Sequence, residues 1–193
     1  MQYLLTPYSQ KIQPFAWWEG AFSEQELDWL QAQARIANTQ ATVGGNPTED
    51  ELKKIRRSQV KWLNNTSDTR WVYEKLAHVV SRLNADYFQF NLTGFGEALQ
   101  LTNYECADRG TYEWHQDYGG GISRKLSLVL QLSDPADYEG GNLQIMTCGQ
   151  PENIRKQRGL ISVFPSYTLH QVTPVTQGSR QSLVTWVSGP NFL

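Results

Sequence analysis

Residues 112–118, Tyr-Glu-Trp-His-Gln-Asp-Tyr, place a histidine and an aspartate two positions apart in a segment that is predicted to be a strand over 111–117. Because the side chains of a strand alternate between its two faces, His115 and Asp117 can point to the same side. His170 follows further along the chain, so two of the three histidines fall in these two segments. Two imidazoles and one carboxylate suit non-haem Fe(II) and leave coordination positions open. The pattern predicts a metal site formed by His115, Asp117 and His170.

A second polar pattern follows His170, where residues 179–188 alternate in the manner of a strand. A guanidinium inside a barrel is costly unless an anion meets it, and its planar fork matches a carboxylate through two hydrogen bonds. We therefore expect a dicarboxylate that chelates the metal at one end and reaches Arg180 at the other. One face of the predicted strand carries Arg180, Ser182, Val184 and Trp186.

These motifs, in this order, resemble the 2-oxoglutarate- and Fe(II)-dependent oxygenase superfamily, and within it the prolyl-4-hydroxylase-like (PKHD-type) bacterial and viral branch. The resemblance covers residues 97–193. Besides His-x-Asp, His170 and Arg180-x-Ser182, four stretches carry it: residues 124–134, 138–143, 163–166 and 169–174.

The resemblance implies Fe(II), 2-oxoglutarate and O2 as cofactors, with ascorbate as a supporting reductant. It implies a dioxygenase that hydroxylates its substrate and releases succinate and CO2. A protein or peptide hydroxylase of the prolyl 4-hydroxylase kind is the expected activity. Hydroxylation of a small molecule or a free amino acid stays open as the alternative.

The resemblance also implies roles for individual residues. The three metal ligands would be the catalytic residues, and Arg180, Tyr104 and Ser182 would bind 2-oxoglutarate. Tyr104 lies farther before His115 than the corresponding tyrosine of the family does, because the loop between them is longer.

Two aromatic residues are expected to line the substrate pocket, namely Tyr112, three residues before His115, and Trp186 on the Arg180 face. Trp186 stands where nucleic-acid dealkylating members of the superfamily carry a second arginine. No nucleic-acid partner is therefore expected.

Length and composition indicate one globular domain. A chain of 193 residues can bury a single core, and its formal net charge of −2 favours neither a polyanion nor a membrane surface as partner. The first residues lack the basic start and apolar run of a signal peptide, so we expect a cytoplasmic location and two reduced cysteines. The expected domain, 1–193, combines helical support and a loop over 1–86 with a β core over 87–193. The oligomeric state cannot be predicted.

The order of the predicted elements favours an α+β fold. Ser23 and Glu26 form a capping-box pattern before a helix expected at about 24–36, and a second helix is expected at about 68–86, capped by residues 65–68. From residue 87 onward, alternating segments separated by turn residues predict about eight strands. We expect a double-stranded β-helix, a cupin-like jelly roll with the N-terminal helices packed on one sheet, as the resemblance also implies.

Residues 38–58 contain Gly44, Gly45 and Pro47 and end in a basic run. We expect them to form a mobile loop that covers the substrate.

Two alternatives belong to other functional classes. A Zn(II) hydrolase could use the same three ligands, but it leaves Arg180 and Ser182 without a role. A non-catalytic cupin-like binding module would not need the complete ligand set.

Overall fold

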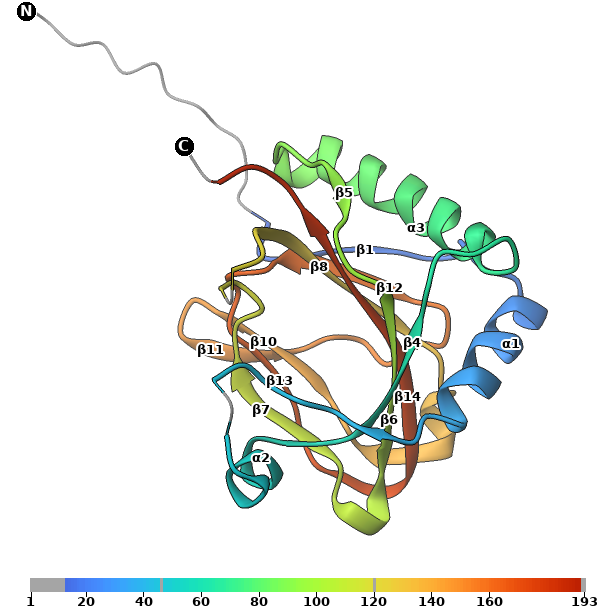
Figure 1. The fold of residues 1–193 in the computed structure, drawn as a ribbon, viewed down its shortest axis with the longest axis vertical. Coiled ribbons are helices and arrows are strands. Elements are labelled where there is room, and N and C mark those ends of the chain that lie inside the picture. The colour runs from blue at the N-terminus through green and yellow to red at the C-terminus, as the bar shows by residue number, and fades with distance from the viewer. Residues whose placement is uncertain (1–12, 46, 120, 192–193) are drawn as a thin grey trace, which may run out of the picture.

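The computed structural model describes residues 13–45, 47–119 and 121–191, which form two facing β-sheets with two helices packed on the larger one (Figure 1). This arrangement confirms the predicted jelly roll with helices on one sheet. No helix within the described ranges is both long and apolar enough to cross a membrane.

The larger sheet is built around the long C-terminal strand, and its neighbouring strands pair in the antiparallel sense. Two short strands, β5 and β9, pair with β14 beside the main path. In order across the sheet the strands are β1 (Ala16–Trp18), β12 (Ile161–Pro165), β8 (Arg124–Gln131), β14 (Val175–Ser188), β6 (Leu99–Glu105), β4 (Gln59–Leu63) and β2 (Thr39–Gln40), with β5 (Gly94–Phe95) and β9 (Tyr138–Gly140) added.

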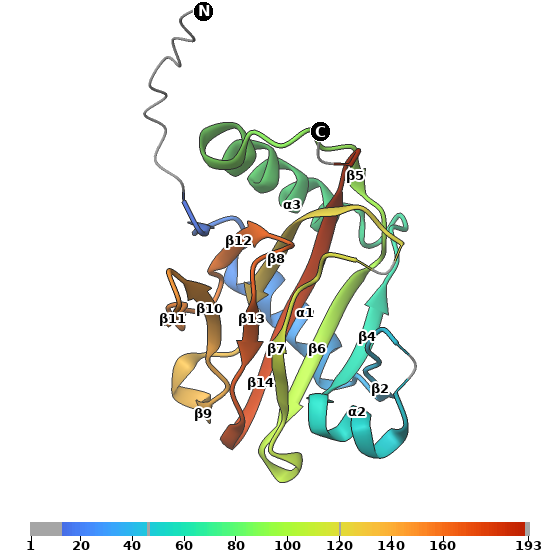
Figure 2. The same cartoon turned by 90° about the vertical axis from the view of Figure 1, so that its left-hand side faces the viewer.

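The smaller sheet faces the inner side of the larger one and carries two of the three predicted metal ligands, His115 and His170. Figure 2 shows two of its strands, β13 and β7, running side by side. In order its strands are β11 (Gln150–Asn153), β10 (Leu143–Thr147), β13 (His170–Val172), β7 (Thr111–His115) and β3 (Arg56–Arg57). Residues before 87 thus supply strands to both sheets.

Alternation of side chains divides the larger sheet into an apolar outer face and a more polar inner face. Leu101, Leu128 and Leu183 are fully buried in the core shared with the helices. Val129 and Tyr104, on the opposite face of these strands, pack in a second core between the two sheets. Burial of a leucine side chain contributes about 1.5–3 kcal/mol. The helix-side core can therefore stabilise the fold while the inner face holds polar groups.

Helices α1 (Glu24–Arg35) and α3 (Arg70–Leu83) cover this outer face. The capping box predicted for α1 is confirmed: the Ser23 N–H donates to Glu26 at 2.7 Å, and the Glu26 N–H donates to the Ser23 hydroxyl at 3.3 Å. The cap predicted for α3 is wrong. Its N-cap is Thr69, which makes no side-chain capping bond because its hydroxyl donates to a carbonyl before the helix. A single π turn, η1 (Asn84–Phe88), extends the end of α3.

A short helix, α2 (Glu49–Ile55), lies where the sequence predicted only loop. Thr48 and Glu51 form a second capping box, with the Thr48 N–H donating to Glu51 at 2.9 Å. None of its residues is buried, so the helix lacks the apolar periodicity by which helices are recognised. The expectation of a structureless loop is wrong over these residues.

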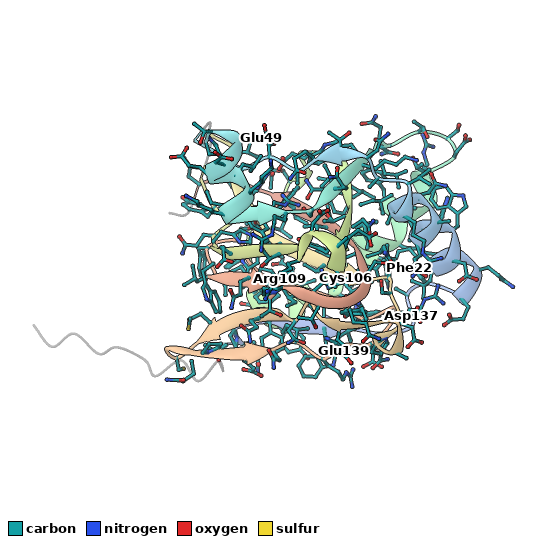
Figure 3. The ribbon with its side chains drawn as sticks, turned by 90° about the horizontal axis from the view of Figure 1, so that it is seen from below. Phe22, Glu49, Cys106, Arg109, Asp137 and Glu139 are labelled. Carbon is teal, nitrogen blue, oxygen red and sulfur yellow. The ribbon has the colours of Figure 1, made fainter. Side chains whose placement is uncertain are left out.

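The connection from β6 to β7 is a tight turn at one end of the molecule, where Figure 3 labels Cys106 and Arg109. It contains η2 (Cys106–Asp108), and η3 (Pro135–Asp137) forms a similar turn before β9. A Cβ added to Gly110 would lie 2.9 Å from the Cα of Tyr104, so only glycine allows this approach. The described cysteines, Cys106 and Cys148, are both free thiols.

Candidate active site

The three predicted metal ligands meet at one end of the smaller sheet. His115 ends β7 and His170 begins β13, and the antiparallel register pairs the two residues directly. Asp117 lies in a turn beyond the strand, and its own backbone N–H donates to the Ser166 carbonyl at 2.9 Å. The strand prediction was therefore wrong for Asp117. One ligand atom from each of the three residues lies within 4.8 Å of the others.

Hydrogen bonds fix how both imidazoles face this point. His115 Nδ1 lies 2.7 Å from the Glu113 carbonyl, and His170 Nδ1 lies 2.9 Å from the Thr168 carbonyl. Since a carbonyl can only accept, each Nδ1 carries the proton and each Nε2 keeps a free lone pair. The Nε2 atoms of His115 and His170 lie 3.7 Å and 3.4 Å from the two Asp117 carboxylate oxygens. The three residues thus present two nitrogens and one carboxylate to a common point.

The protonation of this group suits a metal cation. Burial, with help from His170, lowers the pKa of His115 to about 3, so its imidazole is neutral at neutral pH. Burial alone would raise the pKa of Asp117, but His170, His115 and the Ser127 hydroxyl outweigh it and hold this pKa below its usual value. A histidine binds a metal through its neutral imidazole, and an aspartate binds through its ionised carboxylate. The donor set therefore fits a divalent ion such as Fe(II).

All eight residues predicted for the site border one cavity of about 390 Å³. The cavity lies between the sheets and reaches the 42–44 segment and β4. The four alternating residues of β14 line it together, as their spacing predicts. The eight are His115, Asp117, His170, Arg180, Tyr104, Ser182, Tyr112 and Trp186.

Arg180 lies deep in this cavity, with 2% of its surface exposed. Its guanidinium sits 5.5 Å from the centre of the Tyr104 ring and donates to the Ser182 hydroxyl at 3.4 Å. Among the described residues no carboxylate pairs with it. A buried cation without a counter-ion is costly, so the pocket suits an anionic ligand at this end.

Tyr138 is a neighbour of Arg180 that the sequence did not reveal. Burial raises the pKa of this phenol, while the positive charge of Arg180 acts in the opposite direction, and Gln131 donates to its hydroxyl at 2.9 Å. Tyr138 comes from β9, which pairs with β14 so that Gly178 lies opposite it. A Cβ on Gly178 would lie 2.0 Å from the Asp137 carbonyl. Gly178 was the one sequence feature that could have indicated this pairing, because only glycine lets β14 come so close to residue 137.

The two predicted pocket aromatics lie beside the predicted metal ligands. Tyr112 stacks on His115 with ring centres 3.5 Å apart, and burial raises the pKa of its phenol to about 12. The Trp186 indole lies under the Arg124 guanidinium, at 3.8 Å from the ring centre. Its Nε1 approaches the Asp117 carboxylate without reaching good hydrogen-bond geometry, and it also lowers the pKa of that carboxyl.

Five further residues around the cavity, four polar and one aromatic, were not predicted. Arg124 donates two hydrogen bonds to Glu97, at 2.7 Å and 2.6 Å, and Ser127 donates to Asp117 at 2.6 Å. Arg56 and the half-exposed Trp62 also line the cavity. These five residues belong to β3, β4, β8 and the segment before β6, and nothing in their local sequence indicates that they face the metal ligands.

Replacing Ser127 by alanine is expected to weaken Fe(II) binding by about ten- to a hundredfold, the usual cost of losing a group that orients a ligand. The hydroxyl holds the Asp117 carboxylate and shares a 3.0 Å contact with the Ser166 hydroxyl. Anaerobic Fe(II) titration of the purified variant measures the effect. Thr185→Val is the matched control, because the Thr185 hydroxyl is buried without a hydrogen-bond partner among the described residues. Equal Fe(II) affinity in wild type and Ser127→Ala would contradict this role.

Comparison with known proteins agrees with this geometry. The model of the 2OG-Fe(II) oxygenase superfamily matches residues 99–188. A PKHD-type hydroxylase from Hyphomonas neptunium is 44% identical over 151 residues, which cover 75% of this chain and 65% of that protein. The chain spans about two thirds or less of the length of the curated relatives it matches.

Solved structures share the fold. A prolyl-4-hydroxylase from Pseudomonas putida superposes with a TM-score of 0.70 at 19% identity, covering 92% of this chain and 94% of that one. A prolyl hydroxylase from Trichoplax adhaerens, in complex with a hypoxia inducible factor peptide, gives a TM-score of 0.74 at 15% identity, covering 91% of this chain and 83% of that one. Residues 99–188 of this chain are therefore similar to the 2OG-Fe(II) oxygenase superfamily and the chain to PKHD-type hydroxylases in sequence, while the solved structures show that it shares their fold.

Proposed function

We propose that this protein is an Fe(II)- and 2-oxoglutarate-dependent dioxygenase that hydroxylates its substrate and forms succinate and CO2. The observation that carries the proposal is one cavity bordered by three convergent candidate metal ligands and by a buried guanidinium that no carboxylate of the described residues meets. A bound metal accounts for the convergence of the three side chains, and a dicarboxylate co-substrate accounts for the buried charge of Arg180. A site for a metal alone would leave Arg180 without a partner.

His115, Asp117 and His170 would hold the metal and are the catalytic residues of the proposal. Fe(II) and 2-oxoglutarate, when bound, supply the activation of O2 and the oxidising power for hydroxylation. The protein supplies orientation: the backbone carbonyls beside the two Nδ1 atoms keep both imidazoles in the tautomer that can bind a metal. Ser127 orients the carboxylate in the same way.

The deep end of the cavity would hold the far carboxylate of 2-oxoglutarate. Arg180 offers the cation and the bidentate fork, and the hydroxyl of Ser182 lies beside the guanidinium. Tyr104 forms the wall next to it, and we add Tyr138, whose phenol lies close enough to feel the charge of Arg180. A charged pair enclosed in this way would orient the co-substrate toward the metal ligands.

The open end of the cavity would receive the substrate, for which we propose a peptide or protein. Tyr112, Trp186 and Trp62 give it aromatic walls, and ring contacts suit a peptide side chain such as proline. A structural neighbour binds a peptide of hypoxia inducible factor, and this likeness in fold supports the proposal. A small molecule or a free amino acid is the alternative substrate class.

We also propose that the segment 38–58 covers the bound substrate. Thr42, Val43 and Gly44 line the cavity, and the segment continues through α2 to the β3 edge strand. Closure over the substrate would exclude water from the metal ligands. We propose further that residues 1–193 act as one domain, since strands from residues 16–63 complete both sheets.

The experiment that tests the proposed function combines two readouts on one reaction. Purified protein with Fe(II), ascorbate and 2-oxoglutarate is incubated with peptide and small-molecule libraries, and mass spectrometry measures succinate and the gain of one oxygen atom. The expected result is succinate formation that requires Fe(II), with oxygen gain in one substrate class. Hydrolysis supported by Zn(II) with no use of 2-oxoglutarate would favour a hydrolase, and inertness in every assay would favour a binding module.

A further inference from the structure

Arg56 is a second buried guanidinium at the cavity. It lies on β3, the edge strand of the smaller sheet, with 5% of its surface exposed, and it borders the same space as the metal ligands. Its Cζ lies 4.6 Å from the centre of the Tyr112 ring, and that ring stacks on His115. One aromatic ring thus separates Arg56 from a proposed metal ligand.

The hydrogen bonds of Arg56 leave its charge uncompensated. Its Nε donates to the Ser58 hydroxyl at 2.9 Å and its Nη2 donates to the Gln100 side-chain oxygen at 2.7 Å, and both acceptors are neutral. Its Nη1 makes no hydrogen bond to a described residue, and no described Asp or Glu forms an ion pair with it. Arg124 differs, since Glu97 meets it through two short bonds.

The other charges around the cavity have partners once the proposed ligands are bound. Asp117 would face the metal, Arg180 would face the far carboxylate of 2-oxoglutarate, and Arg124 is already paired with Glu97. Arg56 is the lining cation that remains without an anion among the described residues. A buried, unpaired cation is disfavoured by several kcal/mol in general, so a binding partner of opposite charge would be favoured here.

We propose that Arg56 selects a substrate that carries a carboxylate close to the oxidised carbon. The free Nη1 edge would meet this carboxylate, while Trp62, 45% exposed on the neighbouring part of the cavity, would cover apolar atoms of the substrate. The inference rests on the proposed hydroxylase activity and narrows its substrate class. An acidic side chain of a peptide, a peptide C-terminus and a free amino acid offer the same chemistry.

A purely structural role explains less of the geometry. Support for Tyr112 and Gln100 would not need a permanent charge, and burying that charge is costly. Arg57, the next residue on β3, shows what such a role looks like. It donates to the carbonyls of Arg109 and Lys53 and does not line the cavity.

The test compares synthetic substrates that differ only in charge. The probes are acetylated, amidated pentapeptides with a central proline and glutamate, glutamine or lysine at each flanking position in turn. Two further arms replace the amide by a free C-terminal carboxylate and the peptide by free proline. Wild type, Arg56→Gln and the control Arg82→Gln, at an exposed arginine on α3, are assayed with Fe(II) and 2-oxoglutarate for oxygen gain. Succinate formed without substrate and thermal melting are followed in parallel.

Wild type is expected to prefer a carboxylate over its neutral counterpart in one arm, by about ten- to a hundredfold in kcat/KM, the usual range for a hydrogen bond to a charged group. Arg56→Gln should lose this preference, whereas Arg82→Gln should keep both the preference and the turnover of 2-oxoglutarate without substrate. If Arg56 only supported the structure, Arg56→Gln would lower the melting temperature and leave the preference for charged probes unchanged. The charge preference therefore distinguishes substrate selection from structural support.

Three results would overturn the inference. The first is that wild type forms succinate but hydroxylates charged and neutral probes equally, or hydroxylates neither, in every arm. The second is a carboxylate preference that survives Arg56→Gln. The third is absence of Fe(II)-dependent succinate formation, which refutes the proposed function itself and is distinguished from the other two by that readout.

Discussion

Replacing Asp117 by alanine is expected to abolish Fe(II)-dependent succinate formation while the protein stays folded. Asp117 is the one anion among the three proposed ligands. Loss of a residue that only orients a ligand lowers activity by about ten- to a hundredfold, so loss of Asp117 itself should lower it by more than about a hundredfold. The turn should survive, because it is held by the backbone N–H of residue 117 and the Ser127 hydroxyl keeps Ser166 as a partner. His115→Ala and His170→Ala should likewise lose succinate formation and stay folded.

Succinate formation and thermal melting are measured together, since a loss of activity that follows unfolding would say nothing about the metal. Asp108→Ala is the matched control, because Asp108 is an exposed carboxylate in the turn between β6 and β7. Wild-type turnover by Asp117→Ala at limiting Fe(II) would show that this carboxylate is not a ligand. The same result for either histidine variant would remove that histidine from the site.

Replacing Arg180 by alanine is expected to raise the apparent KM for 2-oxoglutarate by about 30-fold to several thousandfold, since truncating one partner of a buried charged pair costs about 2–5 kcal/mol. Arg180→Lys should fall between wild type and the alanine variant, because lysine keeps a cation and loses the bidentate fork. Titration of 2-oxoglutarate against succinate formation measures the change. Arg82→Ala, an exposed arginine on α3, is the control.

A structural role for Arg180 gives the opposite pattern. In that case the melting temperature and the retention of Fe(II) would fall, and the dependence of rate on 2-oxoglutarate would stay as in wild type. An unchanged KM in Arg180→Ala would therefore remove the co-substrate from this end of the cavity.

Local sequence patterns were sufficient where neighbours in the chain determine the structure. The capping box of Ser23 and Glu26 depends on residues three apart and predicted the start of α1. The alternation of β14 predicted which side chains share a face, and Arg180 and Trp186 indeed line one cavity. Where the pattern was weak, as in α2 with no buried residue, the prediction failed.

Contacts between distant strands could be predicted only for residues that share a functional motif, such as the three proposed metal ligands. The sequence places His170 far from His115, and only the β7–β13 register makes them neighbours. Tyr138 reaches Arg180 because β9 pairs with β14. Arg56 lies in a basic run whose pattern favours a solvated loop or an edge strand over attraction of an acidic substrate, and the burial of its guanidinium appears only when β3 joins β7.

The most direct test of the central claim is the visible absorption spectrum of the protein with Fe(II) and 2-oxoglutarate under anaerobic conditions. Chelation of the metal by the keto acid inside the cavity should produce a weak charge-transfer band that needs both additions. The account predicts this band in wild type and its loss in His170→Ala. A spectrum that stays unchanged when saturating 2-oxoglutarate is added to the Fe(II)-loaded protein would contradict the account.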